Sequence, residues 1–550
     1  MPGPITVFRA RKIITLDPSI PEATHVAVRD GFVIEVGDLD DCGAWGPYTL
    51  DDRFARSVLI PGMIESHAHL LDGALWARGH YVGAVDRHDP SGRLVKGTTN
   101  VPDLVRRLRE IEAGLKDPTQ PLIAWGVDPS LNDPTTGITR HDLDQVSTRR
   151  PIFVLHASCH IAYVNTPTLV LAEYADIRMP GVLRDAAGQP TGELVEIGAM
   201  MSAIKAVASD VVGGSTDPAQ FYNFGKVAQA RGVTCIVDGG TGAYYEPRFL
   251  EAALAATGAE DFPVRLVAHH NGVFVPKVDE MLRHAASLEG KGTDKLIFQG
   301  IKIIVDGSAQ GFTARLQPPG YLGNAANGMW NRGPDELRTL VPALHAAGLQ
   351  IAAHCNGDQA AEMFIEAVAL AQAAKPRFDH RHFIVHGQML DESRMRRMAA
   401  LGIHVSMFSN HLYYWGEFHR ASTVGAFRAG ALNPAATASR LGLVVSAHSD
   451  TPVSPVDPLF TLWCAANRVT AKGRVLGPAE RIAAYDALRL MTYNAAYLLH
   501  LDHEIGSIRV GKRADFAVLG EDPLAIDPMG LRDIPVEGTI LGGRVFGPAA

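Results

Sequence analysis

The chain has 550 residues, of which 47% are hydrophobic and 20% are charged, so it can bury a large core and is long enough for more than one domain. Its formal net charge of −8 offers no basic surface for nucleic acid or for an anionic membrane. Five widely spaced cysteines without a Cys-x-x-Cys pair argue against a disulfide framework and a cysteine zinc site, and favour a reducing compartment.

Both ends of the chain are predicted to form strands. Residues 5–16 and 25–37 alternate apolar and polar side chains, and residues 506–519 and 538–546 do the same near the other end. We predict that residues 1–57 and 505–550 pair into one small β-sandwich domain. Residues 1–18 lack the apolar core of a signal peptide, so we expect a cytoplasmic protein.

Between these ends, eight short apolar runs recur, and helix-like segments follow most of them. The runs are residues 58–66, 233–239, 264–270, 298–307, 350–357, 382–388, 404–410 and 443–450. Eight strand–helix units close a barrel of parallel strands. The sequence therefore predicts an α/β fold, a (β/α)8 TIM-like barrel over residues 58–504. The gap after the first run is too long for one helix and two loops, so we predict a large insertion there, at about residues 76–225.

Six side chains of metal-binding type lie within or just after these runs. They are His67, His69, Lys302, His354, His386 and Asp450. Because the C-terminal ends of all barrel strands open onto one face, residues far apart in the sequence can converge there. A single histidine at such a place is usually a hydrogen-bonded core residue, so it is the joint placement that predicts a metal centre.

Two His-x-His triplets occur, and their positions distinguish them. His67 and His69 follow an apolar run, which places them at the open mouth of the barrel. His380 and His382 precede an apolar run, which places them at the closed end. We predict a metal pair only for the first triplet.

Lys302 lies in a run that is otherwise suited to a buried strand, where an unpaired ammonium group costs several kcal/mol. One explanation is an ion pair with Asp306 or another carboxylate. The other is that burial lowers the lysine pKa, so that the neutral amine captures CO₂ and the carbamate bridges two metal ions.

Asp450 is a candidate catalytic base, because a carboxylate beside the metal can move the proton of the attacking water to the leaving group. Its simpler role would be to cap the following helical turn. His448, two residues earlier, is expected one layer deeper as a supporting partner.

In this order, the segments PGMIESHAH, GIKIIVDGS, HCNGD, FIVHGQ and HSDTPV resemble strand signatures of the amidohydrolase superfamily. The most similar branch is the amidohydrolase 3 group, which includes N-substituted formamide deformylases. The resemblance implies that the six residues above, with Lys302 as a carbamate, hold one or two divalent ions, most often zinc. It also implies that Trp125, His160 and Asn165, in WGVDPS and SCHIAYVNT, lie near the substrate.

Two details bear on the substrate. Val385 stands where the branch usually has glutamate, which leaves ligation intact but alters the surroundings of the metal. The aromatic segment at residues 411–420 is either a pocket wall, with Tyr413, Trp415 and His419 contacting substrate, or simply packed.

We therefore expect hydrolysis of a C–N bond in a small, fairly hydrophobic amide, carbamate or N-formyl compound. Asp450 would act as the base, and His160 would stabilise the oxyanion. The alternatives are a lactonase or phosphotriesterase, a metal-free binding barrel, and a deaminase, which is disfavoured because residues 356–359 lack the expected glutamate. The ligands suit zinc, manganese and iron, and the chain is compatible with either a monomer or a homo-oligomer.

Overall fold

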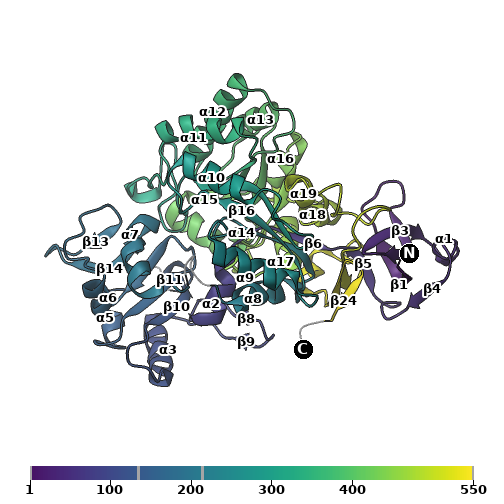
Figure 1. The fold of residues 1–550 in the computed structure, drawn as a ribbon. Helices are drawn as coiled ribbons and strands as arrows, with labels where there is room; N and C mark the ends of the chain where they lie inside the picture. The colour runs from purple at the N-terminus through teal and green to yellow at the C-terminus, as the bar shows by residue number, and fades with distance from the viewer. Residues whose placement is uncertain (1–2, 133–136, 212–215, 548–550) are drawn as a thin grey trace.

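The computed structural model describes residues 3–132, 137–211 and 216–547. A sheet built from both chain ends lies at one side of the molecule, a strand–helix barrel occupies the centre, and the insertion lies at the opposite side (Figure 1). Within the described ranges, no helix has the length and hydrophobicity needed to cross a bilayer.

The centre of the molecule is a sheet of eight strands that are all parallel to their neighbours. In spatial order they are β6 (Met63–Ala68), β15 (Val233–Asp238), β16 (Arg265–Asn271), β17 (Leu296–Ile304), β18 (Ile351–Cys355), β19 (Phe383–His386), β20 (His404–Met407) and β21 (Val445–Ala447). The first and last strands of this sheet, β6 and β21, are linked by side-chain contacts. Ser66 Oγ of β6 lies 3.0 Å from Ser446 Oγ of β21 and donates to the Ala447 carbonyl at 3.1 Å. The predicted barrel is confirmed as a nearly closed one.

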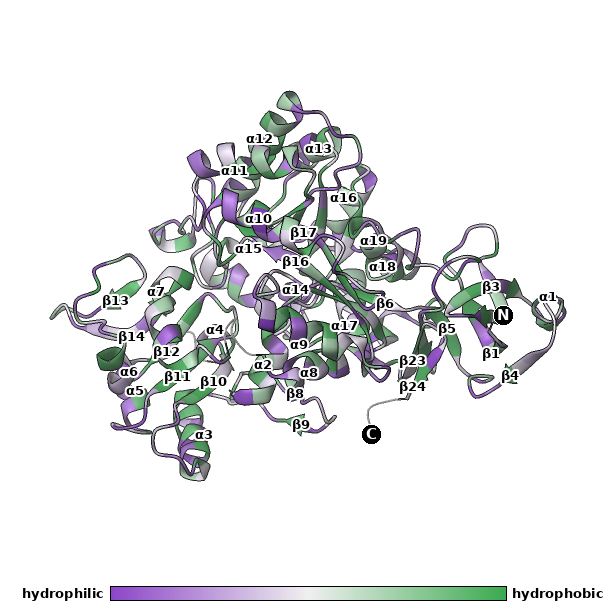
Figure 2. Ribbon diagram, viewed as in Figure 1, coloured by the Kyte–Doolittle hydropathy of each residue, from purple (hydrophilic) through white to green (hydrophobic). Residues whose placement is uncertain are grey.

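Helices cover the outside of this barrel and bury its outer face. They include α8 (Pro218–Gln229), α9 (Pro247–Gly258), α10 (Val278–Leu288), α11 (Pro334–Ala346), α12 (Asp358–Ala374), α13 (Glu392–Leu401) and α17 (Pro458–Asn467). Ile303, Ala353 and Val405 project outward from their strands into one core with Leu344 and Phe364 of the helices. The strands are mainly hydrophobic while the helices present mixed faces (Figure 2). This arrangement leaves the strand ends free to carry polar residues.

The first predicted barrel strand is in fact two strands. β5 (Val58–Pro61) pairs with strands from both chain ends, and the barrel strand β6 begins only at Met63. Gly62 joins them in a tight space, because a Cβ there would lie 2.0 Å from Thr234 Oγ1. The run is continuous in hydrophobicity, so its pattern did not reveal the change of sheet.

The two chain ends share one eight-stranded sheet. It contains β1 (Ile5–Ile14), β2 (Glu22–Arg29), β3 (Phe32–Gly37), β4 (Tyr48–Asp51), β5, β22 (Phe516–Leu519), β23 (Val536–Leu541) and β24 (Arg544–Phe546). Strand β5 connects the strands of the N-terminal end to those of the C-terminal end, because it pairs parallel with β1 and antiparallel with β22. The pairing of the termini is therefore present, while two sheets packed face to face, as in a sandwich, stay a prediction.

The segment between α2 (Leu71–Arg78) and α8 forms its own sheet and core. Its strands are, in spatial order, β13 (Val182–Arg184), β14 (Pro190–Val195), β12 (Ile161–Val164), β11 (Ile152–His156), β10 (Leu122–Val127) and β7 (His80–Tyr81). Helices α3 (Val101–Gly114), α6 (Thr166–Leu171) and α7 (Glu196–Ala203) accompany them. Residues 133–136 and 212–215 of the predicted insertion lie outside the described residues.

A buried ion pair joins the barrel to the terminal sheet. Arg265 Nε donates to Asp515 Oδ2 at 2.6 Å, and Arg265 Nη2 donates to Asp515 Oδ1 at 3.0 Å. Both residues are at most 5% exposed. Removing one partner of such a pair leaves an unpaired buried charge.

We expect Asp515→Ala to cost about 3–5 kcal/mol of stability, because it strands the Arg265 guanidinium group in the interior. Asp294→Ala is the matched control, since it removes an exposed carboxylate 3.5 Å from the same arginine and should cost at most about 1 kcal/mol. Urea unfolding followed by circular dichroism measures both midpoints. Equal shifts in the two variants would contradict the role of the buried pair.

Candidate metal centre

The six predicted ligands converge at one end of the barrel. His67, Lys302, His354 and His386 lie in the C-terminal halves of their strands, and His69 and Asp450 follow β6 and β21 closely. Five of the six are at most 6% exposed, and His69 is half-buried. The structure therefore brings together side chains that span most of the barrel sequence.

Asp450 lies at the centre of this cluster. Its Oδ1 atom lies 3.2 Å from His67 Nε2 and 3.3 Å from His69 Nε2, and its Oδ2 atom lies 3.9 Å from His386 Nδ1. One ligand atom from each of His67, His386 and Asp450 falls within a 4.8 Å group. These spacings suit side chains that share one ion.

Lys302 and His354 complete the cluster. Lys302 Nζ lies 3.1 Å from His67 Nε2, and His354 Nδ1 lies 3.0 Å from His386 Nε2. Asp306 is not the partner of Lys302, because its carboxylate accepts the backbone N–H groups of Arg315, Asn356 and Gly357 at 2.9–3.0 Å. The structure therefore does not support an ion pair with Asp306, while a pair with another carboxylate stays open, since the charge of Asp450 opposes the effect of burial and raises the pKa of Lys302.

Burial favours the neutral forms that metal binding requires. It lowers the pKa of His67, His354 and His386 well below the usual histidine value, so each imidazole is neutral and has one nitrogen without a proton. It also lowers the pKa of Lys302 to about 8, which increases the share of neutral amine near neutral pH.

Three polar atoms of the cluster have no hydrogen-bond partner among the described residues. They are His67 Nδ1, His69 Nδ1 and Asp450 Oδ1, and all three are buried. An unsatisfied buried polar atom costs about 1–3 kcal/mol, so such a concentration needs an explanation. Nitrogen and carboxylate ligands at strand ends fit a zinc, manganese or iron ion. The residues present therefore fit a metal site.

A second layer of side chains holds the first in place. His448 Nε2 lies 3.1 Å from His386 Nδ1, and His448 Nδ1 lies 2.7 Å from Ser406 Oγ, one layer deeper as expected. Glu65 lies two residues before His67 and accepts the Ser449 hydroxyl at 2.8 Å, next to Asp450. Glu65 lies inside an apolar run, so the sequence pattern does not indicate its role. Val385 is fully buried with Ala352 and Phe383.

The insertion contributes one predicted residue, His160, to this end of the barrel. Its ring centroid lies 5.1 Å from that of His354, and its Nδ1 atom lies 2.8 Å from Glu196 Oε2. Asn331 of the barrel also donates to Glu196 Oε2 at 2.9 Å. Burial alone would lower the pKa of His160, but the charge and hydrogen bond of Glu196 raise it above its usual value. Glu196 and Asn331 lie in no spacing pattern that could have revealed them in the sequence.

The other two predicted substrate contacts in the insertion have structural roles. Asn165 is fully buried and caps α6, and its side chain bonds Ile152 N, Ser147 O and Arg150 O at 2.9 Å each. Trp125 is 1% exposed and packs on Tyr81 inside the insertion. Both side chains contact residues of the insertion itself, and these contacts account for their burial, while a place near the substrate stays a prediction.

The aromatic segment at residues 411–420 is helical: it consists of α14 (Asn410–Phe418) and the start of a π-helical turn (His419–Thr423). Tyr413 packs against Phe460 and Trp463 of α17. Trp415 donates to Asp128 Oδ2 at 2.8 Å, and His419 bonds His411 and Thr423. These contacts favour the packed alternative over the pocket wall for all three predicted residues.

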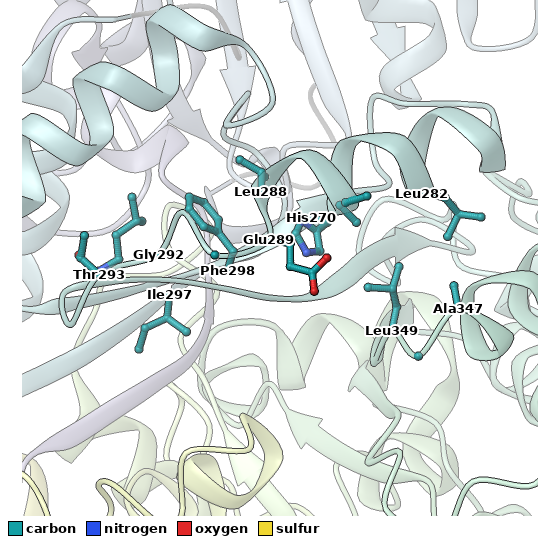
Figure 3. A pocket seen from close by; sticks show the side chains of 15 residues that line it. His270, Leu282, Leu288, Glu289, Gly292, Thr293, Ile297, Phe298, Ala347 and Leu349 are labelled. Atoms are coloured by element: carbon teal, nitrogen blue, oxygen red, sulfur yellow. The ribbon is translucent and has the colours of Figure 1, made fainter.

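Two further features help to locate the site. His380 and His382 lie before β19 and bond the Leu401 carbonyl and the Ile351 N–H group, so the second His-x-His triplet is at the closed end. A cavity of about 660 Å³ lies on the outside of the barrel beside α10, lined by His270, Leu282, Phe298 and others (Figure 3). None of the six cluster residues lines that cavity, so its size does not mark the reaction site.

A parallel barrel with this cluster at its strand ends defines the class of metal-dependent barrel hydrolases. The sequence matches the model of the Amidohydrolase family over residues 57–546. The chain therefore belongs to the amidohydrolase family, as its motifs indicated.

Individual relatives agree over nearly the whole chain. The chain is 27% identical to Protein LONG AFTER FAR-RED 3 of Arabidopsis thaliana, covering 92% of this chain and 85% of that protein. It is 25% identical to the N-substituted formamide deformylase of Arthrobacter pascens, covering 96% of each. An uncharacterised metal-dependent hydrolase from Pyrococcus horikoshii shares the fold, with a TM-score of 0.72, 18% identity, and coverage of 95% and 99%.

We expect His67→Ala to lower the bound divalent metal at least about tenfold, because it removes a ligand that no neighbour replaces. His380→Ala is the matched control, since it removes a buried histidine of the other triplet at the closed end. Plasma mass spectrometry of folded protein, purified without chelators, measures the metal. Equal metal content in His67→Ala and the wild type would contradict the assignment.

Proposed function

We propose that this protein is a metal-dependent hydrolase that cleaves a C–N bond, other than a peptide bond, in a small and fairly hydrophobic compound. The observation that carries this proposal is the convergence of six metal-binding side chains around Asp450, together with the unpartnered buried atoms among them in the described structure. The metal-free binding barrel is disfavoured because the cluster retains every expected ligand.

In this proposal His67, His69, His354, His386 and Asp450 hold one or two divalent ions, with zinc the best match to the nitrogen-rich set. When bound, such an ion acidifies water and polarises a carbonyl group. Lys302 adds an oxygen ligand: its neutral amine forms a bond to CO₂ and loses one proton, which gives a carbamate. The lowered pKa of Lys302, about 8, supports this step.

Asp450 moves the proton in this mechanism. Its carboxylate accepts the proton of the attacking water and passes it to the leaving nitrogen. His160 donates a hydrogen bond to the oxygen on which negative charge develops, a contact worth about 3 kcal/mol in comparable sites. Glu196 supports this role, because it raises the pKa of His160 and fixes its ring through Nδ1.

The substrate class rests on the relatives and on the segment after His354. The relative named as an N-substituted formamide deformylase supports an N-formyl compound or a similar small amide. Deamination is disfavoured, because Asn356 donates to the Gly307 carbonyl, Asp358 accepts from Gln317 N and Gln359 accepts from Arg315. The segment from Asn356 to Gln359 contains no glutamate, and its one carboxylate, that of Asp358, accepts the Gln317 N–H group.

We expect Asp450→Asn to lower kcat by about 100-fold or more, because the amide cannot accept the proton, while the protein keeps its fold. A panel of small N-formyl amines, aryl amides and aryl carbamates, followed by amine release, measures the rate. Asp457→Asn, seven residues along the same loop and helix start, is the control. Near-normal turnover in Asp450→Asn would remove Asp450 from the proton pathway.

The carbamate makes a separate prediction. Protein supplied with ¹³C-bicarbonate should show a protein-bound carbamate signal by ¹³C NMR, and Lys302→Met should lack it. Lys295→Met is the control, since Lys295 lies just before the same strand with its amine on backbone carbonyls. A signal that persists in Lys302→Met would place the adduct elsewhere.

A further inference from the structure

The insertion contacts the loop after Asp450 through one buried arginine. Arg87 opens β8 (Arg87–His88) of the insertion and is only 4% exposed. Its guanidinium group lies over the rings of Tyr81 and Trp125, at 5.4 Å and 5.0 Å from their centroids. These two aromatic residues belong to the insertion, so they fix the direction in which the arginine reaches out.

The tip of Arg87 contacts two parts of the barrel. Its Nη2 atom donates to the Pro452 carbonyl at 2.8 Å, two residues after Asp450. Its Nη1 atom lies 3.4 Å from Asp72 Oδ1, at the start of α2 just beyond His69. Through Arg87, the insertion therefore touches both loops that carry predicted ligands.

Those two loops are also tied to each other. Thr451 Oγ1 donates to Asp72 Oδ1 at 3.0 Å, and His69 N donates to the Thr451 carbonyl at 2.9 Å. Asp72 and Thr451 are each 1% exposed. Buried hydrogen bonds to charged groups contribute more than ordinary ones, because water does not compete for them. Together with Arg87 and Pro452, these residues form one buried network next to His69 and Asp450.

The backbone of Asp450 is unusual. Its φ of +58° lies in the left-handed region, which few residues with a side chain adopt, although aspartate does so more readily than most. The hydrogen bonds to Thr451 and Pro452 act on the two residues that follow. A loss of these bonds would release the backbone that aims the carboxylate.

We propose that Arg87 is a positioning residue through which the insertion holds Asp450 and His69 in their working geometry. This inference rests on the proposed function only where it concerns turnover. In structural terms, it assigns the insertion a second task beside carrying His160. A displacement of about 1 Å at a reacting group can lower a rate about 100-fold, so a remote arginine can act in this way.

The competing explanation is that Arg87 only stabilises the insertion. Arg150 provides the matched control, because it is also buried in the insertion, at 5% exposure, and its hydrogen bonds run to insertion residues, including the Asp117 carbonyl at 2.6 Å and Glu112 at 3.2 Å. A purely stabilising role predicts the same behaviour for Arg87→Met and Arg150→Met. A positioning role separates them.

The first measurement is hydrogen–deuterium exchange of the intact protein, which needs no substrate. We expect Arg87→Met to accelerate exchange at least about tenfold in the peptides that hold the His69 and Val453 amides, whose acceptors lie in this loop. Arg150→Met should leave those peptides at the wild-type rate. Unchanged exchange in Arg87→Met, or equal acceleration in both variants, would overturn the proposal.

The second measurement is kinetic, on the panel compound that the wild type hydrolyses fastest. We expect Arg87→Met to lower kcat about 10–100-fold with KM changed by less than about threefold, and Arg87→Lys and Asp72→Asn to fall between it and the wild type. The two milder variants keep the test valid if Arg87→Met folds poorly. Wild-type kcat in all three would overturn the positioning role, whereas normal turnover in Asp450→Asn would instead overturn the proposed function.

Discussion

The structure depends on a dense group of buried polar side chains around the Asp450 carboxylate. His67, His69 and His386 each lie within 4 Å of that carboxylate, and Lys302 lies against His67. Burial keeps His67 neutral, and the described residues offer the unpaired atoms of the cluster no hydrogen bond. Buried polar groups without partners are costly, and a bound cation would offset that cost, in keeping with the proposed metal site. The barrel, the loops and the insertion all serve to hold this group together.

The insertion supports the cluster from two sides. On one side, His160 faces His354 and is oriented by Glu196, which Asn331 of the barrel holds in turn. On the other side, Arg87 contacts the loop after Asp450. The barrel therefore supplies the proposed ligands, whereas the insertion supplies charges that orient groups around them. The proposed ligands and the groups that orient them therefore come from different parts of the chain.

The sequence predicted the barrel and the convergence of the cluster well, because both follow from local patterns. Each strand is a short apolar run, and each cluster residue lies at the end of a run, where barrel geometry fixes its position. The prediction was poorer for groups whose position depends on tertiary packing. Asn165 and Trp415 are residue types that suit a pocket, yet packing uses their polar atoms.

Glu196 and Arg87 contact the site, yet the sequence did not predict their roles. Neither residue belongs to a recognisable motif, since their partners His160 and Pro452 are far away in the sequence. The split of the first run at Gly62 was also hidden, because strands of two different sheets follow each other without a change in hydrophobicity. One-dimensional patterns identify strand ends, but they do not say which sheet a strand joins.

The way in which β5 joins the two chain ends affects how the protein is made. This strand leads directly into the first barrel strand, yet one of its two neighbours, β22, is synthesised only after the whole barrel has been made. During synthesis the edge of β5 has no partner on that side, and pairing across so long a separation is slow. If β5 folds before β22 is made, its edge on that side is unpaired, and an unpaired strand edge is a place where a chaperone or a second chain can bind.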